Sequence, residues 1–132
     1  MKINPRLKQD IAKYSSYVII VEGKKDVSAM HALGFEKVYA IHQTSIPIRE
    51  RVLEIASMLD KRDKVCILTD FDKKGKTLYF LLKSLFQENG VKLDSTLRGI
   101  ILVAGISHIE GLSTFMKHIE SGVGKKKNWE TR

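Results

Sequence analysis

The sequence contains a single cysteine and no long apolar run, and both absences restrict what the protein can be. Cys66 has no partner for an intramolecular disulfide, so a reducing compartment such as the cytoplasm is expected. No apolar run approaches the roughly 20 residues of a membrane-spanning helix. The segment from Met1 to Asp10 also lacks the apolar core of a signal peptide. The sequence therefore predicts a cytoplasmic protein with no membrane partner.

Acidic residues are scarce relative to basic ones, with 15 Asp and Glu against 23 Lys and Arg and a net charge of +8. An excess of positive charge favours a polyanionic partner, and nucleic acid is the most common one. Many small proteins are basic simply for solubility, so the charge by itself supports nucleic-acid binding only modestly. The length of 132 residues corresponds to one ordinary domain, and a hydrophobic content of 43% is enough for a core.

Hydrophobic periodicity predicts strands that alternate with helices. Strands are expected at 18–23, 37–41, 65–69 and 99–104, and helices at 5–15, 26–34, 47–61, 76–88 and 107–120. Because the connections are short, this order predicts an α/β fold in which a mostly parallel sheet is covered by helices on both faces. The expected organisation is an N-terminal helix within residues 1–16, a domain over 17–120 and a basic C-terminal tail over 121–132.

Two of the predicted strands stop abruptly at carboxylates. Glu22 ends the first of them, and Asp70 and Asp72 follow the third. In a parallel sheet the ligand site lies beyond the carboxyl ends of the strands, which would bring these three side chains together. Neighbouring carboxylates repel one another unless a cation joins them, and carboxylate oxygens suit Mg²⁺. We therefore predict a magnesium site at Glu22, Asp70 and Asp72.

The residues around these carboxylates carry a resemblance to a known family. Val-Glu-Gly-Lys-Lys-Asp at 21–26, followed by Thr-Asp-Phe-Asp-Lys-Lys-Gly at 69–75, resembles the Toprim domain. Topoisomerases, bacterial primases, OLD-family nucleases and the bacterial ribonuclease that matures 5S ribosomal RNA share that domain. The resemblance covers about residues 17–115. It implies a three-layer, Rossmann-like sheet of about four parallel strands flanked by helices.

The resemblance also assigns roles to the three carboxylates. Glu22 corresponds to the glutamate of the family, a metal ligand and a general acid or base, and Asp70 and Asp72 correspond to its metal-binding pair. The implied cofactor is Mg²⁺, with Mn²⁺ as a substitute. The number of ions, and the choice between an acid and a base role for Glu22, stay open.

Two features set the sequence apart from parts of the family. Lys74 stands where topoisomerases have a third acid, and the cysteine-rich zinc module of a primase is absent. A topoisomerase or a complete primase is therefore not expected. The sequence is most similar to small free-standing Toprim proteins, and its size is similar to that of the Toprim part of the 5S ribosomal RNA ribonuclease.

The predicted function is Mg²⁺-dependent phosphoryl transfer on nucleic acid, most simply hydrolysis of phosphodiester bonds in structured RNA or DNA. The alternative is a non-catalytic nucleic-acid-binding or adaptor module, and a protein partner stays open. Flanking lysines would contact the phosphate backbone, although each taken alone is more commonly a solvated surface charge. They are Lys24, Lys25, Lys73, Lys74 and Lys76.

Other polar residues are interpreted as structural. The four histidines lack metal-ligand spacing and are interpreted as helix or loop surface. His108 and Glu110 follow the last predicted strand, near the expected site, and a helix-capping role for Glu110 is preferred over catalysis. Lys125 to Lys127, with Trp129, are expected to form a disordered basic tail rather than a contact with a nucleic-acid strand.

Overall fold

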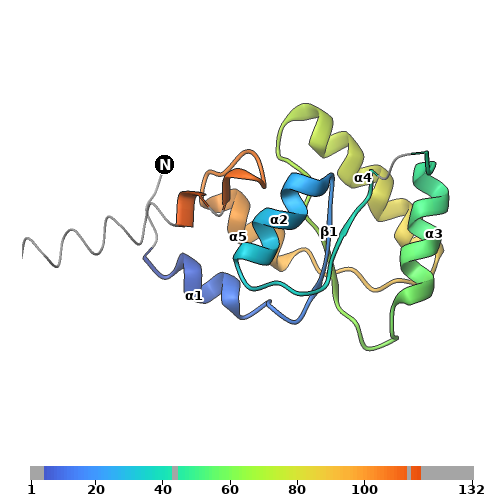
Figure 1. Ribbon diagram of the computed structural model, residues 1–132, viewed down its shortest axis with the longest axis horizontal. Coiled ribbons are helices and arrows are strands. Elements are labelled where there is room, and N and C mark those ends of the chain that lie inside the picture. The colour runs from blue at the N-terminus through green and yellow to red at the C-terminus, as the bar shows by residue number, and fades with distance from the viewer. Residues whose placement is uncertain (1–4, 43–44, 113, 117–132) are drawn as a thin grey trace, which may run out of the picture.

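The computed structural model describes residues 5–42, 45–112 and 114–116 (Figure 1). The elements in chain order are α1 (Leu7–Ala12), β1 (Val18–Val21), α2 (Lys24–Ala32), β2 (Val38–Ala40), α3 (Ile48–Met58), β3 (Val65–Ile67), α4 (Lys73–Glu88) and α5 (Thr96–Val103). The three strands form one sheet in the order β2-β1-β3, and β1 is parallel to both neighbours. The predicted α/β fold with a parallel sheet is confirmed, with three strands rather than four in the part of the chain that the structure describes.

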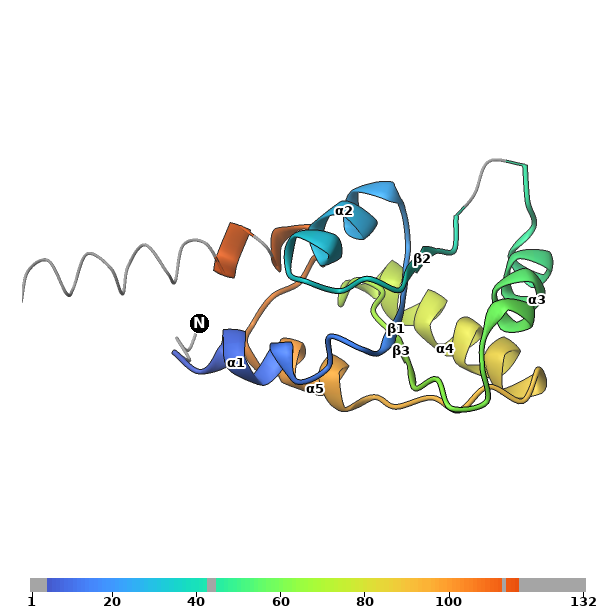
Figure 2. The same ribbon diagram turned by 60° about the horizontal axis from the view of Figure 1, so that its bottom comes forward.

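The central strand β1 is buried on both faces, as its continuous apolar sequence predicts. Ile19 and Val21 point into one core, which they share with α1, α2 and α5. Val18 and Ile20 point into a second core, formed with α3 and α4. Figures 1 and 2 show the resulting layers, with α3 and α4 on one side of the sheet and the other three helices on the opposite side. This is the expected three-layer arrangement.

The strand predicted at 99–104 is wrong, because residues 99–103 belong to helix α5 and Ala104 is its C-cap. Leu97, Ile101 and Ala104 are buried and recur at the spacing of a helical face. Leu102 and Val103 are instead 52% and 78% exposed. A short run of branched apolar residues fits a buried strand and one side of a helix equally well, so the sequence pattern did not distinguish the two.

The outer edge of β3 shows why no fourth strand pairs there. The amide of Asp94 donates to the carbonyl of Val65 at 2.8 Å, beside an isolated bridge between Val65 and Leu93. Further along the same edge, Nη1 of Arg98 donates to the carbonyls of Thr69 at 2.7 Å and Ile67 at 3.4 Å. These carbonyls are the acceptors that a fourth strand would use. A guanidinium from α5 therefore caps the edge in place of a strand.

Helix starts differ from the prediction because side chains cap them locally. α2 begins at Lys24, not at Asp26, whose Oδ2 instead accepts a hydrogen bond from the Gly23 amide at 3.1 Å. α4 begins at Lys73, because Asp72 is its N-cap.

The two ends of the chain also differ in part from the prediction. The N-terminal helix α1 is shorter than predicted. Its Leu7 and Ile11 are buried in the same core as the apolar face of α5. Residues 111–112 and 114–116 are helical, as predicted, whereas 117–120 and the basic tail at 121–132 lie outside the described residues. Within the described chain, no helix is both long and apolar enough to cross a bilayer.

Candidate metal centre

Glu22 and Asp70 meet at the carboxyl ends of β1 and β3. These strands are hydrogen-bonded neighbours, so the residues that follow them lie side by side. The amide of Asp70 donates to Oε2 of Glu22 at 2.9 Å, across 48 residues of sequence. Both side chains are half-buried. The sheet thus presents two carboxylates at one edge.

Asp72 follows Asp70 by two residues and is exposed at the start of α4. Its Oδ1 accepts a hydrogen bond from the amide of Gly75 at 2.7 Å, which caps the helix. Asp72 therefore has a structural role in the fold as well as a place in the predicted site. The positive end of the α4 dipole stabilises the negative charge of this carboxylate.

Gly75 allows the first turn of α4 to approach the backbone of Asp70. A Cβ atom added at Gly75 would lie 2.1 Å from the carbonyl oxygen of Asp70, which is far inside van der Waals contact. The hydroxyl of Thr69 also donates to the carbonyl of Gly75 at 2.7 Å. A Cβ at Gly23, in contrast, would meet nothing within 4 Å. Of the two glycines in the motif, only Gly75 is required sterically.

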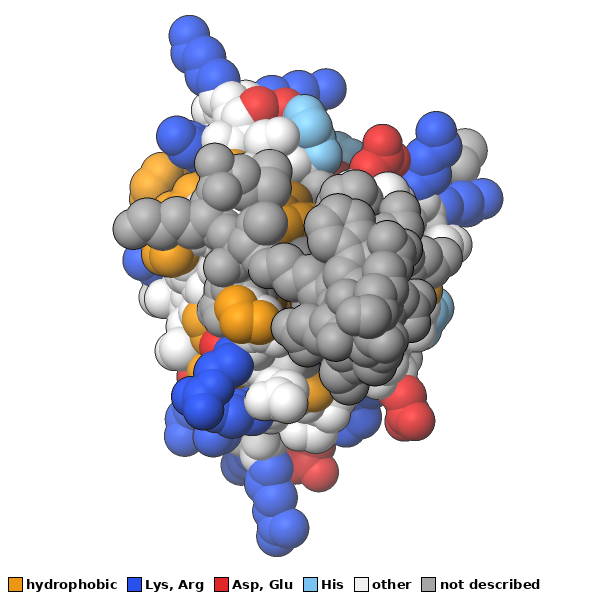
Figure 3. All heavy atoms as spheres, turned by 90° about the vertical axis from the view of Figure 1, so that its left-hand side faces the viewer, with side chains coloured by type: hydrophobic (Ala, Val, Ile, Leu, Met, Phe, Trp, Pro, Cys, Tyr) orange, Lys and Arg blue, Asp and Glu red, His pale blue; other side chains and the backbone are white. Residues whose placement is uncertain are grey.

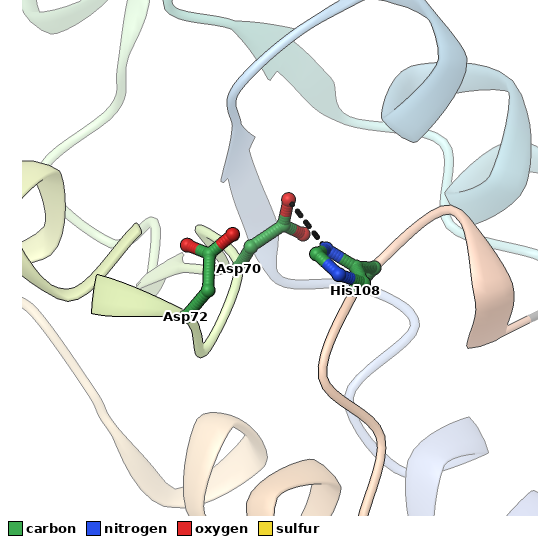
Figure 4. A group of neighbouring side chains, drawn as sticks. All are labelled: Asp70, Asp72 and His108. Carbon is green, nitrogen blue, oxygen red and sulfur yellow. Dashed lines mark ion pairs between the residues drawn. The ribbon is translucent and has the colours of Figure 1, made fainter. Parts of the chain in front are cut away.

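The loop after α5 brings His108 to the same place. The carbonyl of Ser107 accepts from the Phe71 amide at 2.8 Å, and the amide of Ile109 donates to Oδ1 of Asp70 at 2.8 Å. Between these two contacts, Nδ1 of His108 lies 3.3 Å from Oδ2 of Asp70 (Figure 4). Ligand atoms of Asp70, Asp72 and His108 all lie within 4.8 Å of one another.

His108 was not selected from the sequence as a ligand. Metal-binding histidines are recognised by close spacing to other ligands, and His108 lies 36 positions after Asp72, on another element. The one indication in the sequence is that His108 follows the last predicted strand, at 99–104, near the expected site. The predicted ligands were Glu22, Asp70 and Asp72, and the structure groups Asp70 and Asp72 with His108 instead. Glu22 lies next to this group, because its carboxylate accepts a hydrogen bond from the Asp70 amide.

Several carboxylates lie close together at the site, and they shift one another's pKa values. Burial, and then the charge of Asp70, raise the pKa of Glu22 above its ordinary value, although the Asp70 amide opposes this. Burial and the charges of Asp70 and Glu110 likewise raise the pKa of Asp26. The hydrogen bond and charge of Asp70 raise the pKa of His108, because they favour the protonated imidazole. A cation placed here would relieve the repulsion.

The predicted lysines surround the carboxylates on two helices. All five are exposed, and none forms an ion pair within the part of the chain that the structure describes. Lys24 and Lys25 line a hollow of about 360 Å³ together with Glu22, Asp70 and His108. Lys73 and Lys74 line a second hollow along α4, and Lys76 lines neither. On the end of the molecule drawn in Figure 3, the Lys and Arg side chains of the described residues lie mostly around the rim.

The donor set fits a divalent cation. Carboxylate oxygens and an imidazole nitrogen are ordinary ligands for such ions, and the three donors come from two separate segments, 70–72 and 107–109, that backbone hydrogen bonds hold together. Asp70, Asp72 and His108 would hold the ion, with Glu22 beside Asp70.

Comparison with known proteins agrees with this geometry. The Toprim domain family matches residues 16–97. The chain belongs to the Toprim family. This Toprim chain is 30% identical to a UPF0292 protein of Methanosarcina barkeri over 89% of its own length and 83% of the relative. It is 35% identical to a UPF0292 protein of Methanocaldococcus jannaschii over 74% of its length and 77% of the relative.

A solved structure shares the fold. A protein from Aquifex aeolicus superposes with a TM-score of 0.67 at 26% sequence identity, covering 83% of this chain and 98% of the other. Membership of the Toprim family indicates a metal-dependent function related to nucleic acid, and the acidic group described above is a candidate site for the metal.

Proposed function

We propose that this protein hydrolyses phosphodiester bonds in structured RNA or DNA, with Mg²⁺ or Mn²⁺ as cofactor. The observation that carries the proposal is the hydrogen bond from the Asp70 amide to Glu22, which holds two carboxylates together at the sheet edge. Asp72 lies beside them, and lysines that form no ion pair with another described residue flank them on α2 and α4. Repelling carboxylates next to phosphate-binding cations are typical of metal-dependent phosphoryl transfer.

The side chains divide the work of the reaction. A bound divalent cation would neutralise charge on the scissile phosphate and lower the pKa of a water molecule. Lys24 and Lys25 bind and orient the nucleic-acid backbone next to the carboxylates. Glu22 moves the proton, because its carboxylate lies beside Asp70 at the edge of the site. α2 and α4 both begin at the site, so their positive dipole ends favour a phosphate there.

A non-catalytic role in nucleic-acid binding is the second candidate. It is favoured by the contacts that the aspartates already make. Oδ1 of Asp70 accepts from the Ile109 amide, and Oδ1 of Asp72 caps α4. Carboxylates used in this way could hold an ion that binds a phosphate without cleaving it.

Incubation of the purified protein with end-labelled substrates tests the proposal. The substrates are an RNA hairpin, single-stranded RNA, duplex DNA and single-stranded DNA, each with Mg²⁺, with Mn²⁺ or with EDTA. We expect metal-dependent cleavage that Asp70→Asn and Glu22→Gln abolish. Glu36→Gln is the matched control, because Glu36 is exposed at the opposite end of the neighbouring strand β2. Binding without cleavage supports the second candidate, and the absence of both contradicts both.

A further inference from the structure

We propose that His108 is a metal ligand, and that the site therefore selects a first-row transition-metal ion such as Mn²⁺ over Mg²⁺. This rests on the metal site of the proposed function and specifies which ion that site takes. The carboxylates alone do not discriminate strongly between Mg²⁺ and Mn²⁺. The imidazole supplies the discrimination.

The backbone on both sides of His108 holds the imidazole at the site. Ser107 is fixed by its hydrogen bond with Phe71, and Ile109 by its hydrogen bond with Asp70, both at 2.8 Å. The residue between these two anchors has little freedom to move away from Asp70. Figure 4 shows the ring facing the Asp70 carboxylate, with Asp72 on the same segment as Asp70, where α4 begins.

Packing does not explain the position of the ring. The His108 side chain is 55% exposed, so it contributes little to either core. The one ion pair that it forms among the described residues is with Asp70. The hydrogen bonds of the loop are made by the backbones of its neighbours, and they would persist with another residue at 108. Asp70 is therefore the partner that holds the imidazole, and a bound ion would take the place of the Nδ1 proton that faces this carboxylate.

The spacing of the donor atoms suits one ion. Neighbouring ligands on an octahedral ion with bonds of about 2.1 Å lie about 3 Å apart. Nδ1 of His108 lies 3.3 Å from Oδ2 of Asp70, close to this spacing. Asp72 offers a further oxygen within 4.8 Å of both, so a small side-chain rotation would complete three protein ligands.

The chemistry of the donor set determines the selectivity. Mg²⁺ prefers oxygen ligands and keeps much of its water, whereas an imidazole nitrogen suits the borderline ions of the first transition series. Glu22 is not one of the three residues whose ligand atoms lie within 4.8 Å of one another. Replacement of an oxygen donor by nitrogen at this position should lower the affinity for Mg²⁺ relative to Mn²⁺.

Calorimetric titration with each ion tests the selectivity, on protein without a polyhistidine tag. We expect His108→Ala to weaken Mn²⁺ binding about tenfold or more, the scale on which ligand-sphere changes act. Mg²⁺ binding should change by less than about twofold, since it does not depend on the imidazole. His31→Ala is the matched control, because it removes an exposed imidazole at the far end of α2. An equal change for both ions, or no change for Mn²⁺, contradicts the proposal.

Electron spin-echo spectroscopy of bound Mn²⁺ provides a second test that does not depend on affinity or activity. The wild-type complex should show modulation from one directly bound ¹⁴N nucleus, and His108→Gln should remove it. Mn²⁺ bound without nitrogen modulation, but lost in Asp70→Asn, would overturn the role of His108 and leave the proposed function standing. Failure of the wild-type protein to bind either ion would overturn the proposed function as well.

Discussion

At the scale of single residues, Glu22 carries an electrostatic cost that a metal should relieve. Because burial and Asp70 raise its pKa, the folded state binds the Glu22 proton up to a higher pH than the unfolded state does. The stability from this proton is complete below the ordinary pKa of 4.5 and is lost as the pH rises through the folded pKa. Without metal, Glu22→Gln should be at least as stable as wild type at pH 7, and this advantage should disappear near pH 4.

Urea denaturation in EDTA at the two pH values measures this difference, with Glu36→Gln as the control for loss of an exposed carboxylate. Addition of Mn²⁺ should then stabilise wild type more than Glu22→Gln, because binding to the folded state alone adds stability. A Glu22→Gln protein that unfolds in EDTA at pH 7 would make Glu22 a structural residue.

Arg98 is the second residue on which the site depends, although its charge is buried. Its guanidinium carbon lies 4.3 Å from the ring centroid of Phe71 and 4.2 Å from that of Tyr79. The guanidinium also donates a hydrogen bond to the carbonyl of Thr69. A lysine ammonium lacks the planar fork and cannot stack between two rings. Arg98→Lys should therefore lower the free energy of unfolding by about 2 kcal/mol.

The same substitution should weaken metal binding, because Arg98 positions the segment that carries Asp70. Titration with Mn²⁺ measures this effect. Arg62→Lys, an exchange at an exposed arginine, should change neither quantity. Unaltered metal affinity in a destabilised Arg98→Lys protein would limit this residue to a structural role.

At the scale of elements, two helical glycines should respond in opposite ways to alanine. Gly75→Ala forces a Cβ against the Asp70 backbone and should destabilise by about 1–3 kcal/mol, the cost of overpacking. Gly99 lies inside α5 with open space around it, so Gly99→Ala should stabilise by about 0.5–1 kcal/mol through helix propensity. Denaturation of both variants measures the contrast. Stabilisation by Gly75→Ala would mean that α4 does not approach Asp70 as described.

At the scale of the whole molecule, the net charge of +8 should make nucleic-acid binding sensitive to salt. The affinity should fall steeply between low and physiological salt, because bound phosphates release condensed counterions. Lys24→Gln with Lys25→Gln should weaken binding and reduce the slope of log affinity against log salt by up to about 2. The pair Lys83→Gln and Lys92→Gln removes equal charge from exposed positions away from the carboxylates. Equal effects of the two pairs would show attraction to overall charge rather than to this site.

The sequence by itself determined the central strands and where they end. The apolar runs before Glu22 and Asp70 suit only a buried position, and a strand that is buried on both faces needs a parallel sheet with helices on both sides. The carboxylates that follow these runs therefore had to lie at one edge. The strands and their ends depend on residues that are adjacent in the chain, and the parallel pairing of β1 and β3 then brings Glu22 and Asp70 to the same edge.

The tertiary structure alone decided the rest, because it depends on contacts between distant segments. Residues 99–104 form a helix since Asp94 and Arg98 already occupy the free edge of β3, and an apolar run does not reveal whether an edge is available. His108 joins the candidate metal site through hydrogen bonds between its neighbours and residues 70–71, more than 30 positions earlier. Local sequence preferences do not encode such long-range hydrogen bonds, and these bonds place the one nitrogen donor among the carboxylates.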